Sequence, residues 1–274
     1  MKQSQHIYCD QNEPIYVGVD VPAGDAKPFF IAVLRSANDG CARLLAIASR
    51  ETIEETLKYI LSHGAHIVAI DAPQLWCFGC EIVNSTFSLH FPRDGWDGAG
   101  NCMRPCEREL WQRFRIPCFP TTATTFYWFR KLILRGWQLY AEFLKRGYHI
   151  ATHVPNCIEE ASPHRWLLEV YPHATYKLLS AEQLHQKRTV AGRRQRIMIL
   201  QRYINNIREH FYKRIPTPDE NDALAAAITG FLWSRGKCIA LGVATKGGCL
   251  FVPCNSRRIE TRGERLSLSI DSLR

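Results

Sequence analysis

The sequence predicts an α/β fold in which one mixed sheet is covered by helices on both faces. Three observations support this prediction. Three β-rich segments near the start follow one another at hairpin spacing, and the strand-like segments after them alternate with helical ones. Hydrophobic residues make up 46% of the 274 residues and charged residues 22%, which is the balance of a globular protein with a substantial core. The first strands should therefore form an antiparallel meander, and the later strands should join the sheet in parallel.

Short apolar segments rich in β-branched residues mark the strands. The segment "IYVGVD" ends in Asp20, and "HIVAIDAP" contains Asp71 just before the proline that breaks it. The turn sequence "NDG" separates the second strand from the third. We expect strands at 15–20, 28–36, 42–49, 66–73 and 165–174, followed by a terminal hairpin at 238–254.

Helical periodicity appears in four segments. Residues 49–64 begin with Ser49 as a cap and end at a glycine. Residues 124–147 have one very apolar side, and residues 193–213 predict a basic amphipathic helix. The helix at 218–233 is almost entirely small and apolar after its acidic first turn, which would let it lie close against the sheet.

The chain is expected to form one domain over residues 1–274. Residues 74–123, rich in Gly, Cys, Pro and aromatic residues, would be a long insertion, and 255–274 a flexible tail. No signal peptide is apparent and no apolar run could span a bilayer, so we expect no membrane contact. The 11 cysteines are an odd number, which favours reduced thiols in a cytoplasmic protein. Cys77 and Cys80 have the spacing of zinc ligands, so a structural zinc competes there with buried thiols.

Acidic residues lie at the ends of three predicted strands, at Asp20, Asp71 and Glu169. Ligands bind at such strand ends in open α/β sheets. Asp219 and Asp222 open the last helix three residues apart, so they share one helical face. Carboxylates brought together repel one another unless protons or cations intervene, and oxygen ligands suit Mg²⁺ or Mn²⁺. Two such cations can promote phosphodiester cleavage. The alternative for Asp219 is a simple N-cap.

Six motifs occur in order along the chain. They are "VGVDVP" at 17–22, "AIDAPQ" at 69–74, "RPCERELWQRFRIPCFPTT" at 104–122, "LEVYPHATYKLL" at 168–179, "DENDALAAAITGF" at 219–231 and "LGVATKGGCLFVP" at 241–253. Together they resemble the domain-of-unknown-function 429 family, predicted nucleases with an RNase H-like fold. The resemblance implies an RNase H-like mixed five-stranded sheet flanked by helices, with a long insertion after the fourth strand and a C-terminal hairpin.

The late "DxxDA" pattern also resembles the RuvC-type resolvases of that fold. This resemblance implies a set of catalytic metal ligands for Mg²⁺ or Mn²⁺, namely Asp20, Asp71, Asp219 and Asp222. Asp71 stands where many RNase H-like nucleases have Glu. Glu169 joins the candidate catalytic acids because it too ends a predicted strand.

Two further residues of the family motifs, Arg104 and Glu107, are candidate substrate-binding residues. Arg104 either holds a substrate phosphate or pairs with Glu107 or Glu169 and braces the site. Between Ala181 and Ile215 there are nine Lys or Arg against two Glu, the footprint of a polyanion-binding surface. A nucleic-acid backbone would contact Arg193, Arg194 and Arg196, although a solvated helix face has the same composition.

These features predict a divalent-metal-dependent nuclease that hydrolyses phosphodiester bonds of DNA or RNA. One alternative is a nucleic-acid-binding module whose acids no longer catalyse. Another is a nucleotide-dependent phosphotransferase, although the chain has no glycine-rich phosphate loop. The nuclease hypothesis predicts that Asp20, Asp71 and Asp222 lie within one metal site, and that the insertion covers it.

Overall fold

The computed structural model describes residues 13–24, 26–37, 39–74, 104–118, 121, 123–161, 164–245 and 247–254. Three predictions therefore fall outside the described residues. They are the zinc site at Cys77 and Cys80, the tail at 255–274, and most of the insertion, with its predicted place over the acids.

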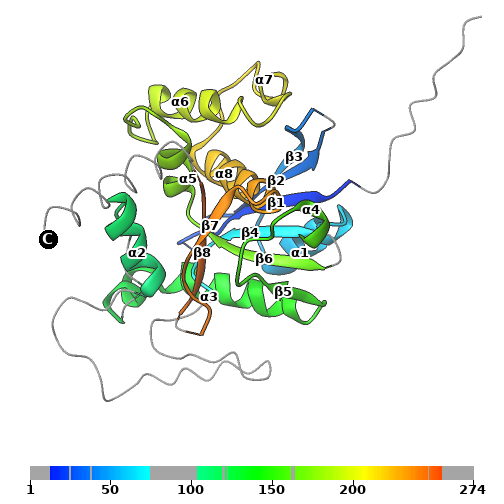
Figure 1. Cartoon of the computed structure of the whole chain (residues 1–274). Helices are drawn as coiled ribbons and strands as arrows, with labels where there is room; N and C mark the ends of the chain where they lie inside the picture. The colour runs from blue at the N-terminus through cyan, green and yellow to red at the C-terminus, as the bar shows by residue number, and fades with distance from the viewer. Residues whose placement is uncertain are drawn as a thin grey trace, which may run out of the picture.

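One mixed sheet forms the centre of the molecule (Figure 1). Its strands are β1 (Ile15–Asp20), β2 (Phe29–Ser36), β3 (Ala42–Arg50), β4 (Ile67–Asp71), β5 (Tyr148–Ile150), β6 (Arg165–Val170), β7 (Cys238–Val243) and β8 (Gly248–Pro253). They lie in the order β3-β2-β1-β4-β6-β8-β7, and β5 pairs with β6. The first three strands are antiparallel, whereas β4, β6 and β8 continue the sheet in parallel from β1. This arrangement confirms the predicted RNase H-like fold class.

Among the described residues the sheet has eight strands, because the predicted terminal hairpin and the short β5 join the five strands that were predicted. The terminal hairpin joins the sheet because Glu169 and Val170 of β6 pair with Leu250 and Phe251 of β8. The short strand β5 pairs with the earlier part of β6 through Tyr148 and its neighbours. Both additions use hydrogen-bonding groups of β6 that would otherwise form a free sheet edge.

Helices cover both faces of the sheet. They are α1 (Ile53–Ser62), α2 (Pro105–Phe114), α3 (Ala123–Leu144), α4 (Ile158–Ala161), α5 (Pro172–Leu179), α6 (Val190–Leu200), α7 (Ile207–His210) and α8 (Pro218–Trp233). On one face α8 packs with α5, α6 and α7, and on the other α1 packs with α3 (Figure 1). Within the region predicted to be irregular, α2 forms a regular helix and packs against the β7–β8 hairpin. No helix in the described ranges is long and apolar enough to cross a bilayer.

Several predicted element boundaries differ from the structure. The strand β3 continues to Arg50, so Thr52 rather than Ser49 caps α1, in a capping box with Glu55. The strand predicted at 165–174 ends at Val170, because Pro172 starts α5. Proline is favoured in the first turn of a helix, where a backbone N–H has no helical partner.

The predicted helix 193–213 is also wrong, since α6 ends at Leu200 and only the short α7 follows. The intervening chain pairs instead with the edge strand β3. Ala42 donates to the Tyr203 carbonyl at 2.7 Å and accepts from the Asn205 N–H at 3.0 Å. The Asn206 side chain accepts from the Leu44 N–H and donates to its carbonyl, at 2.8 and 2.9 Å. These bonds satisfy an open sheet edge that a continuous helix would leave exposed.

The small residues of α8 let its backbone touch β1. A Cβ atom added at Gly18 would lie 2.1 Å from the Ala223 carbonyl oxygen and 2.2 Å from the Ala227 nitrogen. No side chain fits at this position unless α8 moves away. Close contact therefore explains both the glycine before Asp20 and the alanine-rich helix opposite it.

Gly18→Ala is accordingly expected to destabilise the protein by about 3 kcal/mol or more, because overpacking against backbone cannot be relieved by a rotamer change. Urea denaturation followed by circular dichroism measures this loss. The matched control is Gly24→Ala, since an added Cβ there meets no described atom within 4 Å. Equal stabilities for the two variants would contradict the close contact.

Candidate active site

Asp20 and Asp71 lie side by side at the ends of neighbouring strands. The strands β1 and β4 are parallel, and the two aspartates are register partners. Side chains alternate between the faces of a strand. Tyr16 on β1 and Ala69 on β4 belong to the core beneath α8, so the two aspartates point to that same face. Register and alternation together bring the two carboxylates next to each other below the start of α8.

The N-terminus of α8 is fixed by a capping box and an ion pair. Thr217 is the N-cap and accepts from the Glu220 N–H, so the alternative in which Asp219 caps the helix is wrong. The Glu220 carboxylate in turn accepts from the Thr217 N–H at 2.7 Å and from both terminal nitrogens of Arg214 at 2.6 Å. Asp219 is left partly exposed in the first turn, and Asp222 is buried one turn further in.

Asp222 has a cationic partner that the sequence analysis did not assign to the site. The Lys187 ammonium donates to Asp222 Oδ2 at 2.6 Å from a loop between α5 and α6. No spacing rule predicts this contact, because 35 residues separate the two side chains. The surplus of basic residues between Ala181 and Ile215 was the one sequence signal that included Lys187.

The pKa values show that the acids interact. Burial raises the pKa of Asp20 well above its usual value, and the neighbouring carboxylates of Asp222, Asp71 and Asp219 raise it further. Burial and the charge of Asp222 likewise raise the pKa of Asp71. Burial raises the pKa of Asp222 as well, although Lys187 opposes this. Because the ionised carboxylates repel one another, a cation that enters the site would stabilise their ionised forms.

The chemistry of this donor set fits Mg²⁺ or Mn²⁺, because it consists of carboxylate oxygens alone. Among the described residues, however, no group of three or more His, Cys, Asp or Glu side chains is arranged to hold a metal ion. That Asp20, Asp71 and Asp222 share one metal site therefore stays a prediction. What the fold supplies is an adjacent pair, Asp20 and Asp71. Mg²⁺ is commonly bound by one or two carboxylates and completes its shell with water and substrate phosphates.

Glu169 does not point toward the aspartates. Its neighbour Leu167 belongs to the core beneath α3, whereas Leu168 belongs to the core beneath α8, so alternation places Glu169 on the α3 face. There it accepts from both terminal nitrogens of Arg104, at 2.5 and 2.9 Å. It also accepts from the Gln74 N–H at 2.8 Å, three residues after Asp71. Glu169 is thus placed to fix the chain that follows Asp71.

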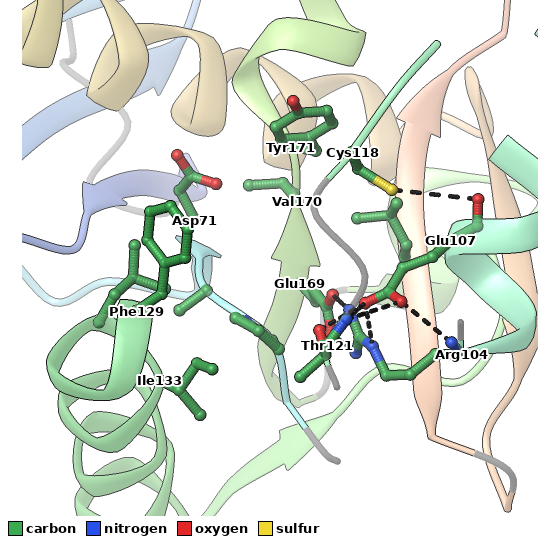
Figure 2. Close-up of a pocket in the computed structure, with 14 residues that line it drawn as sticks. Asp71, Arg104, Glu107, Cys118, Thr121, Phe129, Ile133, Glu169, Val170 and Tyr171 are labelled. Atoms are coloured by element: carbon green, nitrogen blue, oxygen red, sulfur yellow. Dashed lines mark hydrogen bonds and ion pairs between the residues drawn. The ribbon is translucent and has the colours of Figure 1, made fainter. Parts of the chain in front are cut away.

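Arg104 and Glu107 complete this buried network (Figure 2). The Arg104 Nε donates to Glu107 Oε1 at 2.7 Å, and a terminal nitrogen donates to the Gly247 carbonyl at 3.0 Å. Glu107 also accepts from the Thr121 N–H. Arg104, Glu107 and Glu169 are all nearly inaccessible to solvent. Arg104 could hold a substrate phosphate or brace the site, and these contacts fit a brace.

A cavity of about 180 Å³ separates Asp71 from this network. Figure 2 shows Phe129 and Tyr171 near Asp71, with Glu169 turned away toward Arg104. The cavity lies directly beside one carboxylate of the acidic pair, and its lining combines apolar side chains with the charged Arg104, Glu107 and Glu169.

The three arginines predicted to bind phosphates differ in their surroundings. Arg196 is buried, donates to the His185 and Gly192 carbonyls, and stacks on the Tyr176 ring. Arg193 is half-buried and donates to the Pro216 carbonyl, whereas Arg194 is exposed. The fold thus uses Arg196 to tie α6 to the preceding loop, and an exposed row of three arginines does not form.

Comparisons with known proteins agree with the sequence motifs. The model of a family described as "Protein of unknown function (DUF429)" matches residues 18–245. None of the curated proteins matches the chain. Among solved structures, one described as "T. thermophilus RuvC in complex with Holliday junction substrate" aligns with a TM-score of 0.38 and 13% sequence identity. The alignment covers 78% of this chain and 91% of that one.

Proposed function

The chain belongs to the DUF429 family, and we propose from its acidic site that it hydrolyses phosphodiester bonds of nucleic acid with Mg²⁺ or Mn²⁺ as cofactor. The observation that carries the proposal is the pairing of Asp20 with Asp71 on parallel strands, with Asp222 close enough to raise the pKa of both. A fold tolerates such repulsion when a bound cation relieves it.

In this proposal Asp20 and Asp71 hold the cation, and Asp219 and Asp222 add negative charge from the start of α8. A divalent cation bound there would supply Lewis acidity toward the phosphodiester. Glu169 acts as a positioning residue, since its bond to the Gln74 N–H holds the segment that follows Asp71. Lys187 offsets part of the negative charge through its contact with Asp222.

The second candidate function is a nucleic-acid-binding module that does not catalyse. The ion pair between Lys187 and Asp222 favours it, because the ammonium supplies a cation from the chain itself. The two candidates differ in one respect that can be measured, which is whether a divalent metal changes the substrate covalently.

Labelled single-stranded, duplex and branched DNA and RNA, incubated with the purified protein, test the proposal. Cleavage with Mg²⁺ or Mn²⁺ that stops on adding EDTA is the expected result. Binding without cleavage under any metal condition would replace the nuclease with the binding module. Loss of binding to every substrate at low salt would contradict both, because phosphate contacts are strongest there.

A further inference from the structure

A second cavity lies on the same side of the sheet as the acids. Its volume is about 620 Å³, and it is bounded by the chain after α2, by α5, and by the loop before α6. It is larger than the cavity beside Asp71. Its lining is also chemically different, because it contains more cationic side chains than acidic ones. We call it the basic groove.

Four cationic side chains line the basic groove: Arg115, Lys177, Lys187 and Arg196. Glu182 is the one carboxylate among the described lining residues. Arg115 is exposed and Lys177 is half-buried. Neither forms an ion pair with a carboxylate within the part of the chain that the structure describes. The groove therefore presents positive charge that this part of the protein does not neutralise.

The backbone at Arg115 also marks the groove. Arg115 follows α2 with φ of 55° and ψ of 33°, a left-handed conformation that few residues other than glycine adopt. Arginine has no intrinsic advantage at this position, where glycine would be relaxed. The long cationic side chain is thus present at some conformational cost, which is a common feature of ligand-binding positions.

Lys187 connects the basic groove with the acidic site. This residue lines the groove and at the same time donates to Asp222. An anion in the groove would consequently lie close to the acidic site.

The pKa of His173 reflects the positive charge of the groove. It lines the cavity, and its pKa is lowered to about 4 by burial and by the cations Lys177, Arg196 and Lys187. The imidazole is therefore neutral at pH 7, so that it does not add to the charge. A bound anion would oppose the cations and raise this pKa.

We propose that the basic groove binds phosphate groups and holds a nucleic-acid strand next to the acidic site. The direction of the strand toward the acids rests on the proposed function. The binding itself does not, because it depends on the cations alone and requires no metal. The shared ligand chemistry is the phosphate group, which a polynucleotide or a free nucleotide can provide.

The test is a binding measurement in EDTA with the Arg115→Gln/Lys177→Gln double variant. Fluorescence anisotropy of a labelled single-stranded DNA oligonucleotide should show a loss of affinity of roughly tenfold per charged contact. The slope of the logarithm of affinity against the logarithm of salt concentration should become shallower by about one for each lost contact. The matched control, Arg43→Gln/Lys58→Gln, removes the same charge from exposed positions on β3 and α1 and should bind like the wild type. Thermal melting verifies that all variants are folded.

Two results would overturn the proposal that the groove binds phosphate groups. One is an equal loss of affinity in the control, which would mean that net charge alone governs binding. The other is a loss confined to Arg193→Gln/Arg194→Gln, which would assign the strand to α6. In the wild type, ¹H–¹⁵N NMR of His173 provides a site-specific measurement. Its pKa should rise when inorganic phosphate or the oligonucleotide binds, and an unchanged pKa with either bound would also contradict the proposal.

Competition with ATP and inorganic phosphate identifies the source of the phosphate. Displacement of the oligonucleotide by a large excess of either supports a shared phosphate site in the groove. Binding of ATP without any binding of the oligonucleotide supports the groove but contradicts a nucleic-acid substrate. Oligonucleotide binding in the groove without metal-dependent cleavage would leave this inference standing and remove the proposed hydrolysis.

Discussion

Asp71→Asn is expected to slow metal-dependent cleavage strongly and, at neutral pH, to make the protein more stable than the wild type. Loss of one of the two adjacent carboxylates should lower the cleavage rate by about 10²- to 10³-fold, the usual range for removing an electrostatic contribution at a reacting centre. Asn keeps the size of the side chain, so binding of nucleic acid should be unchanged or slightly tighter.

The gain in stability follows from the raised pKa of Asp71. Between the unfolded pKa, about 4, and the higher folded pKa, the folded state holds more protons than the unfolded state. The free energy of unfolding therefore falls as the pH rises through the folded pKa. Asn has no charge to place in the site and avoids this loss. We expect a gain of about 1–2 kcal/mol at pH 7, or roughly 2–8 °C in Tm.

Thermal melts at pH 4 and pH 7, with and without Mn²⁺, measure this effect. The difference in Tm between variant and wild type should be small at about pH 4, where the aspartate is protonated in the folded state and about half protonated in the unfolded state. The difference in Tm should become smaller in Mn²⁺, because the cation stabilises only the wild-type pair. The control Glu54→Gln removes a charge from the exposed side of α1 and should change Tm little. A less stable Asp71→Asn at pH 7 would refute the electrostatic strain.

Arg104→Met is expected to cause the largest loss of stability, about 3–5 kcal/mol. The guanidinium bonds to Glu107 and Glu169, and all three side chains are buried. Removing it leaves two carboxylates in the interior without their counter-ion. The segment after Asp71 should loosen as well, since Glu169 holds the Gln74 N–H.

Urea denaturation of Arg104→Met, of Glu169→Gln and of Arg104→Met/Glu169→Gln measures the loss. The double variant should recover part of it, because one unpaired charge is gone, and the difference from additivity gives the coupling between the two side chains. Arg113→Met in the same helix is the control. Its pair with Glu109 is 42% and 33% exposed, so a change below about 1 kcal/mol is expected. Equal losses of unfolding free energy for Arg104→Met and Arg113→Met would show that the buried network adds nothing to stability.

Much of the fold followed from local patterns in the sequence. The runs that end at Asp20 and Asp71 are apolar and are closed by proline or a turn, so their strands were predicted almost to the residue. The helix from Pro218 to Trp233 was also recognisable, because small residues and an acidic first turn are properties of adjacent positions. Gly18 illustrates the limit, since its role depends on a backbone far along the chain.

The sequence by itself determined that two apolar strands end at Asp20 and Asp71, and the parallel register of β1 and β4 in the structure makes these two residues partners. Only the tertiary structure decided the rest of the site. Leu167 and Leu168 are both apolar, so no alternation in the sequence revealed that Glu169 faces away from Asp71. Arg196 is buried, and Lys187 reaches Asp222 from a loop. Such contacts join distant segments whose relative positions are set by packing against the sheet, a property that no local periodicity encodes.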